Sequence, residues 1–276
     1  MARIPMQSDR IIVFSHIPKT AGTSLTHLLR RHFGTSQLDA KFRSNADRAA
    51  YFPKDLRNDM LLYPNVRLIS GHCMKPFVHF DEFSDRMDWV TFLRDPVKRF
   101  VSHYVHRQTE LDVRDRTDLL TWHREKKRPN WMVEMLAGEQ NVEKAKEILS
   151  SKFKFVGHTE EFERSLEMMK VALRLWGFDT KLNAPKMVMR DTSIKDEVYA
   201  NFSKYEDLIL SSNELDIELY DFFKREIWPN QCRLLLKAPS TPETAPVNHG
   251  RNLLLGKLKR NALYKPFVSV QELLSM

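Results

Sequence analysis

Glycine, cysteine and long hydrophobic runs are all scarce in this chain. Only 8 of its 276 residues are glycine, about 3 % against a usual share of about 7 %. A glycine within a motif is therefore a candidate for a structural or functional role. The 2 cysteines, Cys73 and Cys232, are too few for a disulfide framework or a four-ligand zinc site, and we expect reduced thiols. No apolar run approaches the roughly 20 residues that a membrane-spanning helix needs, and no signal-peptide pattern opens the chain. These absences predict a soluble, cytoplasmic protein.

Apolar residues and positive charge are plentiful. The apolar share is 42 % and includes 17 Phe, enough for a sizeable core, which excludes the disordered, collagen-like and low-complexity classes. Lys and Arg number 44 against 36 Asp and Glu, a net charge of +8. This surplus suggests an anionic partner, such as nucleic acid, an acidic glycan, a phosphorylated cofactor or a membrane surface, without selecting one.

Strand and helix patterns alternate along the chain. Strands are predicted at 11–14, 66–70, 89–93 and 153–157. Helices are predicted from the hydroxyl residues at 23–24 to a cap at Gly34, over 96–105, near 130–137 and 142–150, from 160 to about 176, and from about 214 to 228. Residues 35–64 are polar and mixed, and their hydrophobic periodicity is weak. Residues 107–129 are rich in charge, which predicts an exposed connection or insertion. The alternation predicts an α/β fold with a mainly parallel sheet. We expect one domain over residues 1–236 and a C-terminal tail over 237–276, partly flexible or packed on the domain.

Residues 16–24, HIPKTAGTS, have the layout of a phosphate cradle. A strand ends, Lys19 and Gly22 follow, and hydroxyl residues open a helix whose N–H groups and dipole could hold an anion. The loop is not a Walker A motif, because Lys19 precedes its only glycine. On spacing alone, an ordinary strand–helix turn with a solvated lysine explains the pattern equally well.

Residues 94–104 form the second segment of interest. Arg94 follows a strand, where its guanidinium group could hold a phosphate through two hydrogen bonds. Asp95 and Pro96 are typical of an N-cap and a first helical position. Ser102 lies eight residues beyond Arg94, on a different helical face from the apolar stripe that follows Pro96.

Together, these two segments resemble the sulfotransferases that use 3′-phosphoadenosine 5′-phosphosulfate (PAPS). The branch with heparan sulfate 2-O-sulfotransferases and bacterial carbohydrate sulfotransferases is the most similar. Residues 16–24 match its 5′-phosphosulfate loop, and residues 93–104 match its 3′-phosphate motif. The resemblance is strong over residues 11–105 and looser to about 225. It implies a P-loop-like three-layer fold, PAPS as donor with 3′-phosphoadenosine 5′-phosphate (PAP) as product, no metal, and an acceptor hydroxyl of a carbohydrate or glycolipid.

The resemblance also implies residue roles. Lys19 is expected to contact the sulfuryl group and stabilise the leaving phosphate, and His72, which follows Gly71 between the two motifs, is expected to be the catalytic base. The family often has a second histidine where this chain has Ser70. His16 is the rival candidate for the base, although it could only shape the loop, and His103, next to Ser102, could face either the cofactor or solvent. The expected cofactor-binding residues are Lys19, Thr20, Ala21, Gly22, Thr23, Ser24, Arg94 and Ser102.

Other interpretations remain open at this point. One is a magnesium-dependent nucleotide kinase or NTPase on a related scaffold, and another is a non-catalytic protein that binds anionic glycans. No nucleic-acid-binding motif is present. Residues 183–195 are expected near the adenine and 3′-phosphate. A basic set could line an acceptor groove, although charged runs are usually solvated faces: Arg107, Arg114, Arg116, Arg124, Lys126, Lys127 and Arg128.

Overall fold

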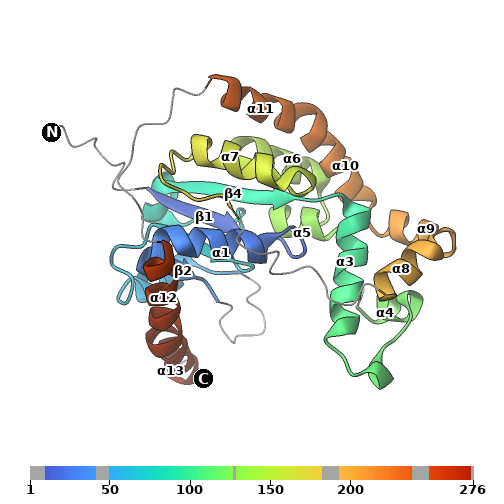
Figure 1. Ribbon diagram of the computed structural model, residues 1–276, viewed down its shortest axis with the longest axis horizontal. Coiled ribbons are helices and arrows are strands. Elements are labelled where there is room, and N and C mark those ends of the chain that lie inside the picture. Colours follow the sequence, from blue (N-terminus) through green and yellow to red (C-terminus); the bar gives the residue numbers. More distant parts are fainter. Residues whose placement is uncertain (1–9, 42–49, 127–128, 182–192, 238–248, 275–276) are drawn as a thin grey trace.

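The computed structural model describes residues 10–41, 50–126, 129–181, 193–237 and 249–274, and its centre is a parallel sheet (Figure 1). The five strands are β1 (Ile11–Ser15), β2 (Gln37–Asp39), β3 (Leu68–Gly71), β4 (Met87–Leu93) and β5 (Phe153–His158). Their order is β2-β3-β1-β4-β5, and every neighbouring pair is parallel. The predicted α/β fold with a parallel sheet flanked by helices is confirmed.

The central strands are apolar because both faces of the sheet are covered. All five residues of β1 are buried, and its Val13 pairs with Ile69 on β3 and with Trp89 on β4. In Figure 1, α1 and α12 lie on one side of the sheet, and α6 and α7 lie on the other. Adjacent parallel strands point their carboxyl ends to the same edge, so β1, β3 and β4 deliver their following loops to one place.

Helices occupy most of the remaining described chain. Their bounds are α1 (Gly22–Phe33), α2 (Pro53–Asp59), α3 (Pro96–Thr109), α4 (Leu119–Lys126), α5 (Trp131–Ala137), α6 (Val142–Ser151), α7 (Phe162–Ala172), α8 (Ser193–Ala200), α9 (Phe202–Ser211), α10 (Glu214–Phe222), α11 (Trp228–Lys237), α12 (His249–Lys259) and α13 (Lys265–Leu274). Two π-helical turns, Phe223–Ile227 and Arg260–Tyr264, join α10 to α11 and α12 to α13.

The helix boundaries at the two motifs are as predicted. Asp95 accepts a hydrogen bond from the Lys98 N–H at 2.9 Å and is the N-cap of α3, with Pro96 as its first residue. Gly34 ends α1 with φ +56°, and its N–H donates to the carbonyl oxygen of Arg30. The start of α3 and the end of α1 therefore coincide with capping residues that the sequence shows.

Several expectations were wrong in detail. Residues 107–129, expected to be an exposed connection, contain α4, whose Leu119 and Trp122 are buried in contacts with other helices. The helix expected over 214–228 continues through a π-helical turn into α11, which ends at Lys237. Residues 35–64, where the periodicity is weak, contain the edge strand β2 and the helix α2. The helix expected to run from Glu160 to Trp176 is α7, which ends at Ala172. It ends early because Arg174 takes a left-handed conformation (φ +52°), and the Leu175 N–H then donates back to the Lys170 carbonyl oxygen. Gly177 (φ +77°) lies in the following turn.

Helix α3 leads away from the sheet into a second apolar cluster (Figure 1). Its stripe residues Phe100, Val101, Tyr104 and Val105 pack there with side chains from α4, α8 and α9. The predicted stripe thus has a structural role. The face of α3 that carries Ser102 is left for another contact.

The described part of the C-terminal tail packs on the body of the protein. Asn252 on α12 donates to the carbonyl oxygen of His32 at 3.0 Å, and the buried Tyr264 hydroxyl donates to Asp59 at 2.8 Å. Residues 238–248 lie outside the described part. Among the helices that are described, none has the length and apolar character needed to cross a membrane.

Candidate functional site

A cavity of about 710 Å³ opens where the loops after β1, β3 and β4 meet. Residues 16–24 and residues 94–104, the two expected anion-binding motifs, both line this cavity, and His72 lies beside them. The lining residues from those segments, together with His72, are His16, Pro18, Lys19, Ala21, Gly22, Thr23, Ser24, Arg94, Ser102 and His103. The parallel sheet thus brings together residues that are far apart in the chain.

The loop before α1 presents backbone N–H groups to the cavity. Lys19 and Ala21 both have left-handed backbones, with φ of +69° and +62°. Such residues cost conformational energy and cluster at ligand-binding turns. The first helical hydrogen bond of α1 runs from Leu25 N–H to Ala21, and no described side chain caps the helix. The N–H groups at the start of α1 therefore lack helical partners, which favours an anion there.

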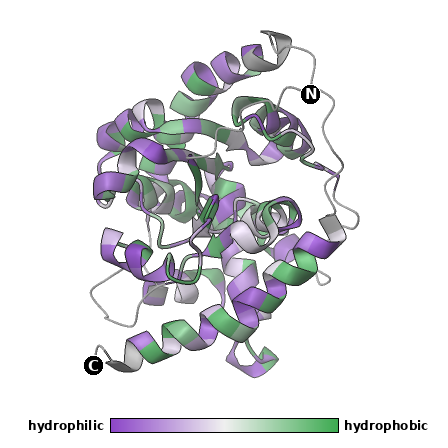
Figure 2. Ribbon diagram, turned by 90° about the vertical axis from the view of Figure 1, so that its left-hand side faces the viewer, coloured by the Kyte–Doolittle hydropathy of each residue, from purple (hydrophilic) through white to green (hydrophobic). Residues whose placement is uncertain are grey.

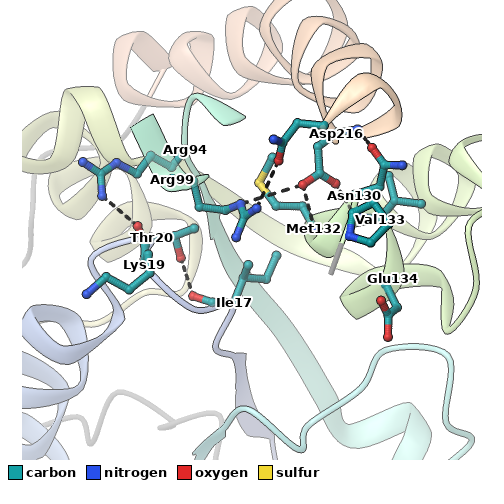
Figure 3. Close-up of polar contacts among 12 residues, drawn as sticks. Ile17, Lys19, Thr20, Arg94, Arg99, Asn130, Met132, Val133, Glu134 and Asp216 are labelled. Atoms are coloured by element: carbon teal, nitrogen blue, oxygen red, sulfur yellow. Dashed lines mark hydrogen bonds and ion pairs between the residues drawn. The ribbon is translucent and has the colours of Figure 1, made fainter. Parts of the chain in front are cut away.

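Thr20 has a different position from its neighbours. It is buried, and its hydroxyl donates to the carbonyl oxygen of Ile17 at 2.8 Å, a bond drawn in Figure 3. It is not among the cavity-lining residues. The Thr20 side chain thus closes the loop on itself, and any contact with a bound anion is left to its backbone.

Gly22 is required by the close approach of His16. A Cβ at position 22 would lie 1.8 Å from Nε2 of His16, well inside van der Waals contact. The imidazole is therefore packed against the start of α1. Burial, aided by the nearby His72 and Lys19, lowers the pKa of His16 to about 3. His16 is neutral at physiological pH and shapes the loop.

The hydrogen bonding of His72 fixes its tautomer. Its Nδ1 lies 2.6 Å from the carbonyl oxygen of His16, and the two rings stack with centroids 4.0 Å apart. A carbonyl oxygen can only accept, so Nδ1 carries the proton and neutral His72 has a lone pair on Nε2. Burial lowers the pKa of His72, and Lys75 adds to this effect, while the bond to His16 opposes it. A neutral imidazole with a free lone pair can accept a proton at pH 7.

Lys19 and Arg94 place two positive charges at the cavity wall. The Arg94 Nη1 donates to the Lys19 carbonyl oxygen at 3.0 Å, which ties the two motifs together (Figure 3). The Arg94 Nε is buried without a hydrogen-bond partner in the described structure, and Glu160 Oε1 is 3.9 Å away. Burial lowers the pKa of Lys19, helped by the charge of Arg94. Anionic groups next to Lys19 and Arg94 would offset the repulsion between the two charges, and one beside Arg94 would supply an acceptor for its guanidinium group.

Helix α3 contributes Ser102, His103, His106 and Arg107 to the same wall. His103 also contacts the Trp131 ring, with centroids 4.5 Å apart. From the basic set that was considered for an acceptor groove, Arg107 alone lines the cavity among the residues whose side chains are described. The side chains of Lys126, Lys127 and Arg128 lie outside that part, as do Asn183, Lys186 and Arg190 of the loop expected near the adenine.

Sequence reasoning missed the contribution of α5. Trp131, Glu134 and Met135 line the cavity from this helix, and Glu134 is the one carboxylate among the described lining residues. Lys75, which follows β3, donates to the sulfur of Met135 at 2.5 Å. The segment was predicted as a helix, but its periodicity gave no sign of which face would meet the loops.

A buried network positions α5 (Figure 3). Asp216 on α10 accepts hydrogen bonds from the N–H groups of Met132 at 3.0 Å and Val133 at 2.8 Å, and so caps α5. Asn130 in turn accepts from the Leu215 N–H at 2.9 Å. The fully buried Arg99 of α3 lies 3.8 Å from Asp216. These contacts hold α3, α5 and α10 together behind the cavity.

Comparison with known families agrees with this arrangement. A model described as the sulfotransferase family matches residues 3–226, which is most of the chain and includes both motifs. The chain belongs to the sulfotransferase family. No curated protein matches it. Membership in the family assigns sulfuryl transfer in general as the reaction class. In this chain the candidate catalytic groups of the two loops lie around one cavity.

The resemblance drawn from the two motifs is thus confirmed at the level of the family. The 2-O-sulfotransferase-like branch and the individual roles of the cavity residues stay predictions. Because this sulfotransferase has its Lys19, His72 and Arg94 side chains around one cavity, those roles can be proposed together as one mechanism.

Proposed function

We propose that this sulfotransferase moves a sulfuryl group from PAPS to a hydroxyl of a carbohydrate or glycolipid, with His72 as the base. One observation carries the proposal: residues of the two segments that resemble phosphate-binding motifs and a neutral histidine line the same cavity. A nucleotide with phosphates at both the 5′ and 3′ positions needs two separated anion sites, and the loop at 19–24 and Arg94 with Ser102 offer them.

The residues present fit such a donor. The 5′-phosphosulfate would lie at the start of α1, where Gly22, Thr23 and Ser24 offer N–H groups without helical partners and two hydroxyls. The 3′-phosphate would accept hydrogen bonds from Arg94, whose Nε has no partner in the described residues, and from Ser102. The bound donor supplies an electrophilic sulfur and a phosphate leaving group.

The proposed mechanism is an in-line transfer. His72 accepts the proton of the acceptor hydroxyl at Nε2 while the oxygen attacks the sulfur, because Nδ1 is already committed to His16. Lys19 holds its positive charge near the bridging oxygen and stabilises the negative charge that develops on the leaving phosphate. The His16 carbonyl keeps the His72 ring oriented and stabilises the imidazolium that forms.

The acceptor class rests on the resemblance and on the charge of the cavity. Lys75 and Arg107 line it in addition to the proposed donor-binding residues. Their charges favour an acceptor that is itself anionic, such as an acidic sugar. This positive lining is also part of the net charge of +8 that the sequence shows.

A magnesium-dependent nucleotide kinase on a related scaffold is less well supported. Such enzymes hold Mg²⁺ with carboxylates and substrate phosphates. Among the described lining residues the single carboxylate is Glu134, which comes from α5 and not from a strand end. The position of Lys19 before Gly22 also departs from the Walker A order. A non-catalytic glycan-binding protein would have no need of a histidine with a fixed tautomer.

The test is to incubate the protein with PAPS labelled in the sulfuryl group and a panel of glycans, glycolipids and phenols, with a chelator present. We expect label to appear in at least one glycan or glycolipid with wild-type protein and at least 100-fold less with Lys19→Ala. Lys98→Ala, an exposed lysine of α3, is the matched control. Transfer to no acceptor, together with no affinity for PAP, would overturn the proposal.

A further inference from the structure

The C-terminal helices α12 and α13 expose an unusual amount of apolar surface. Leu254, Leu258, Leu263 and Val270 are each between 53 % and 60 % exposed, and Leu255 is 39 % exposed. Six other large apolar side chains are exposed in all the rest of the described chain. Figure 2 shows the helix that runs to the C-terminus, along which hydrophobic and hydrophilic residues alternate.

The buried residues of this segment define which side faces the body. Gly256 lies against the backbone of Gly34 on the loop after α1, and Tyr264 and Val268 are buried. Gly256 and Tyr264 are eight residues apart, which in a regular helix is a rotation of about 80°. The π turn at Arg260–Tyr264 contains a longer hydrogen-bond step, and this brings both residues to the same side.

The exposed leucines then form one continuous stripe. A step of two residues rotates a side chain by about 200°, to the far side of the helix. Leu254 and Leu258 lie two residues before and after Gly256, and Val270 lies two residues after Val268, so all three face away from the body of the protein. The two remaining leucines each precede a buried residue and share one flank of the helix: Leu255 before Gly256 and Leu263 before Tyr264. The stripe extends from Leu254 to Val270, about 24 Å along the helical segment that runs from His249 to Leu274.

Positive charge follows the other flank. Lys257 and Lys265 are exposed and come directly after Gly256 and Tyr264, so they share the flank opposite to Leu255 and Leu263. Arg251 is exposed near the first turn. The sequence contains no Asp or Glu between Glu243 and Glu272. Two further cations point inward: Lys259 donates to the Thr35 carbonyl oxygen and Arg260 pairs with Asp39.

We propose that the outer face of α12–α13 is a docking surface for an anionic lipid membrane. Helices that bind at a membrane surface have an apolar stripe bordered by lysines, as this helix does. The leucines would enter the boundary of the acyl chains, and the lysines would contact anionic headgroups. A second copy of the chain is a poorer occupant, because two faces of the same positive charge would repel. A soluble acidic glycan would satisfy the lysines but would leave the leucines in water. This surface does not depend on the function of the cavity.

The test measures sedimentation of the full-length protein with phosphatidylcholine vesicles and with vesicles that contain about one third phosphatidylserine. We expect binding to the anionic vesicles to be at least tenfold tighter, and to weaken as salt is raised. Leu258→Ser should reduce that affinity about tenfold, and Lys257→Gln about fivefold. Leu61→Ser is the matched control, since Leu61 is 74 % exposed but lies after α2; it should bind like wild type.

Thermal unfolding of each variant shows that the fold is kept, which is expected because the altered side chains are exposed. Equal binding of Leu258→Ser and wild type to vesicles would overturn the proposal. It would also be overturned by a concentration-dependent dimer that Leu258→Ser abolishes, which assigns the stripe to a second copy. Binding to a soluble sulfated glycan that is lost in Lys257→Gln but kept in Leu258→Ser, without vesicle binding, would likewise overturn it.

Discussion

His72 donates its Nδ1 proton to the carbonyl oxygen of His16 across 2.6 Å, and the two imidazole rings stack with centroids 4.0 Å apart. His16 thus holds the His72 ring in place. His16 is held neutral by burial, with a pKa of about 3, and packs on Gly22 at the start of α1. The proposed base, His72, and the loop at 16–24 are therefore coupled through one residue, His16.

The first prediction concerns His72 as base. His72→Ala should lower kcat by about 10²- to 10⁴-fold, the usual contribution of general-base catalysis, while the Kd for PAP stays within about twofold. Steady-state transfer assays and calorimetric titration measure the two quantities. Glu134→Gln, which alters the carboxylate of the same cavity, is the comparison and should keep kcat within a few-fold. A fall in kcat for Glu134→Gln with normal turnover for His72→Ala would assign the base to Glu134.

The pH dependence of the reaction follows from the pKa shifts. Burial lowers the pKa of His72 below its ordinary 6.5, so the neutral base persists into mildly acidic solution. We expect kcat/KM to be flat near pH 7 and to fall only below about pH 6.5 as His72 gains a proton. The pKa of Lys19 is also lowered, from 10.5, so a second fall should begin at a pH below that value. An acid limb that persists unchanged in the residual activity of His72→Ala would contradict the assignment.

Gly22 gives a test of the coupling between the loop and His16. Gly22→Ala places a methyl group 1.8 Å from the His16 ring, so the ring or the loop must move, and we expect PAP affinity to fall at least tenfold. His16→Ala removes the obstructing ring. The double variant Gly22→Ala/His16→Ala should therefore bind PAP more tightly than Gly22→Ala alone. Additive losses in this double-mutant cycle would show that the two positions act independently.

Arg94 should provide selectivity for the 3′-phosphate. Loss of a charge-assisted hydrogen bond is worth about 1.5–3 kcal/mol, so Arg94→Ala should weaken PAP binding about 10- to 100-fold. Binding of adenosine 5′-monophosphate, which lacks the 3′-phosphate, should change little. Titration of both nucleotides against wild type, Arg94→Ala and the exposed control Lys98→Ala gives the comparison. An equal loss of affinity for both nucleotides would place Arg94 elsewhere on the ligand.

The network behind the cavity predicts a stability effect. Asp216 is fully buried, its two oxygens accept from Met132 and Val133, and it lies 3.8 Å from Arg99. Asp216→Asn turns an NH₂ group toward a backbone N–H and removes the carboxylate that lies beside the buried charge of Arg99. We therefore expect a loss of about 3–5 kcal/mol in the free energy of unfolding. Asp221→Asn, exposed near the end of the same helix, should change it by less than about 0.5 kcal/mol. Denaturant titration measures both; equal small effects would contradict the network's role.

Local signals explain what the sequence could predict. The strand β1 begins with a continuous apolar run, β4 is rich in aromatic and β-branched residues, α3 begins at an Asp95–Pro96 cap, and the two loops have a residue pattern that resembles a known family. These features are contained in short windows of sequence. The sheet then places the ends of β1, β3 and β4 side by side, so the meeting of residues 16–24, His72 and Arg94 follows from the parallel topology.

Features that depend on contacts between distant segments could not be predicted in this way. The strand β2 has only three residues, Gln37–Asp39, and it forms because β3 offers it a free edge. Trp131 and Glu134 reach the cavity because Asp216 caps α5 from a helix more than 80 residues later. The early end of α7 depends on the left-handed backbone of Arg174, which is not a residue type that marks such a turn.

The central claim is that the cavity is built for a nucleotide with phosphates at both 5′ and 3′ positions, and calorimetric titration tests it most directly. Wild-type protein is titrated with PAP in the presence of a chelator and, separately, with ATP and Mg²⁺. We predict that PAP binds without metal and at least tenfold more tightly than ATP with Mg²⁺, and that this preference disappears in Arg94→Ala. Tighter binding of ATP that requires Mg²⁺, with little affinity for PAP, would contradict the account.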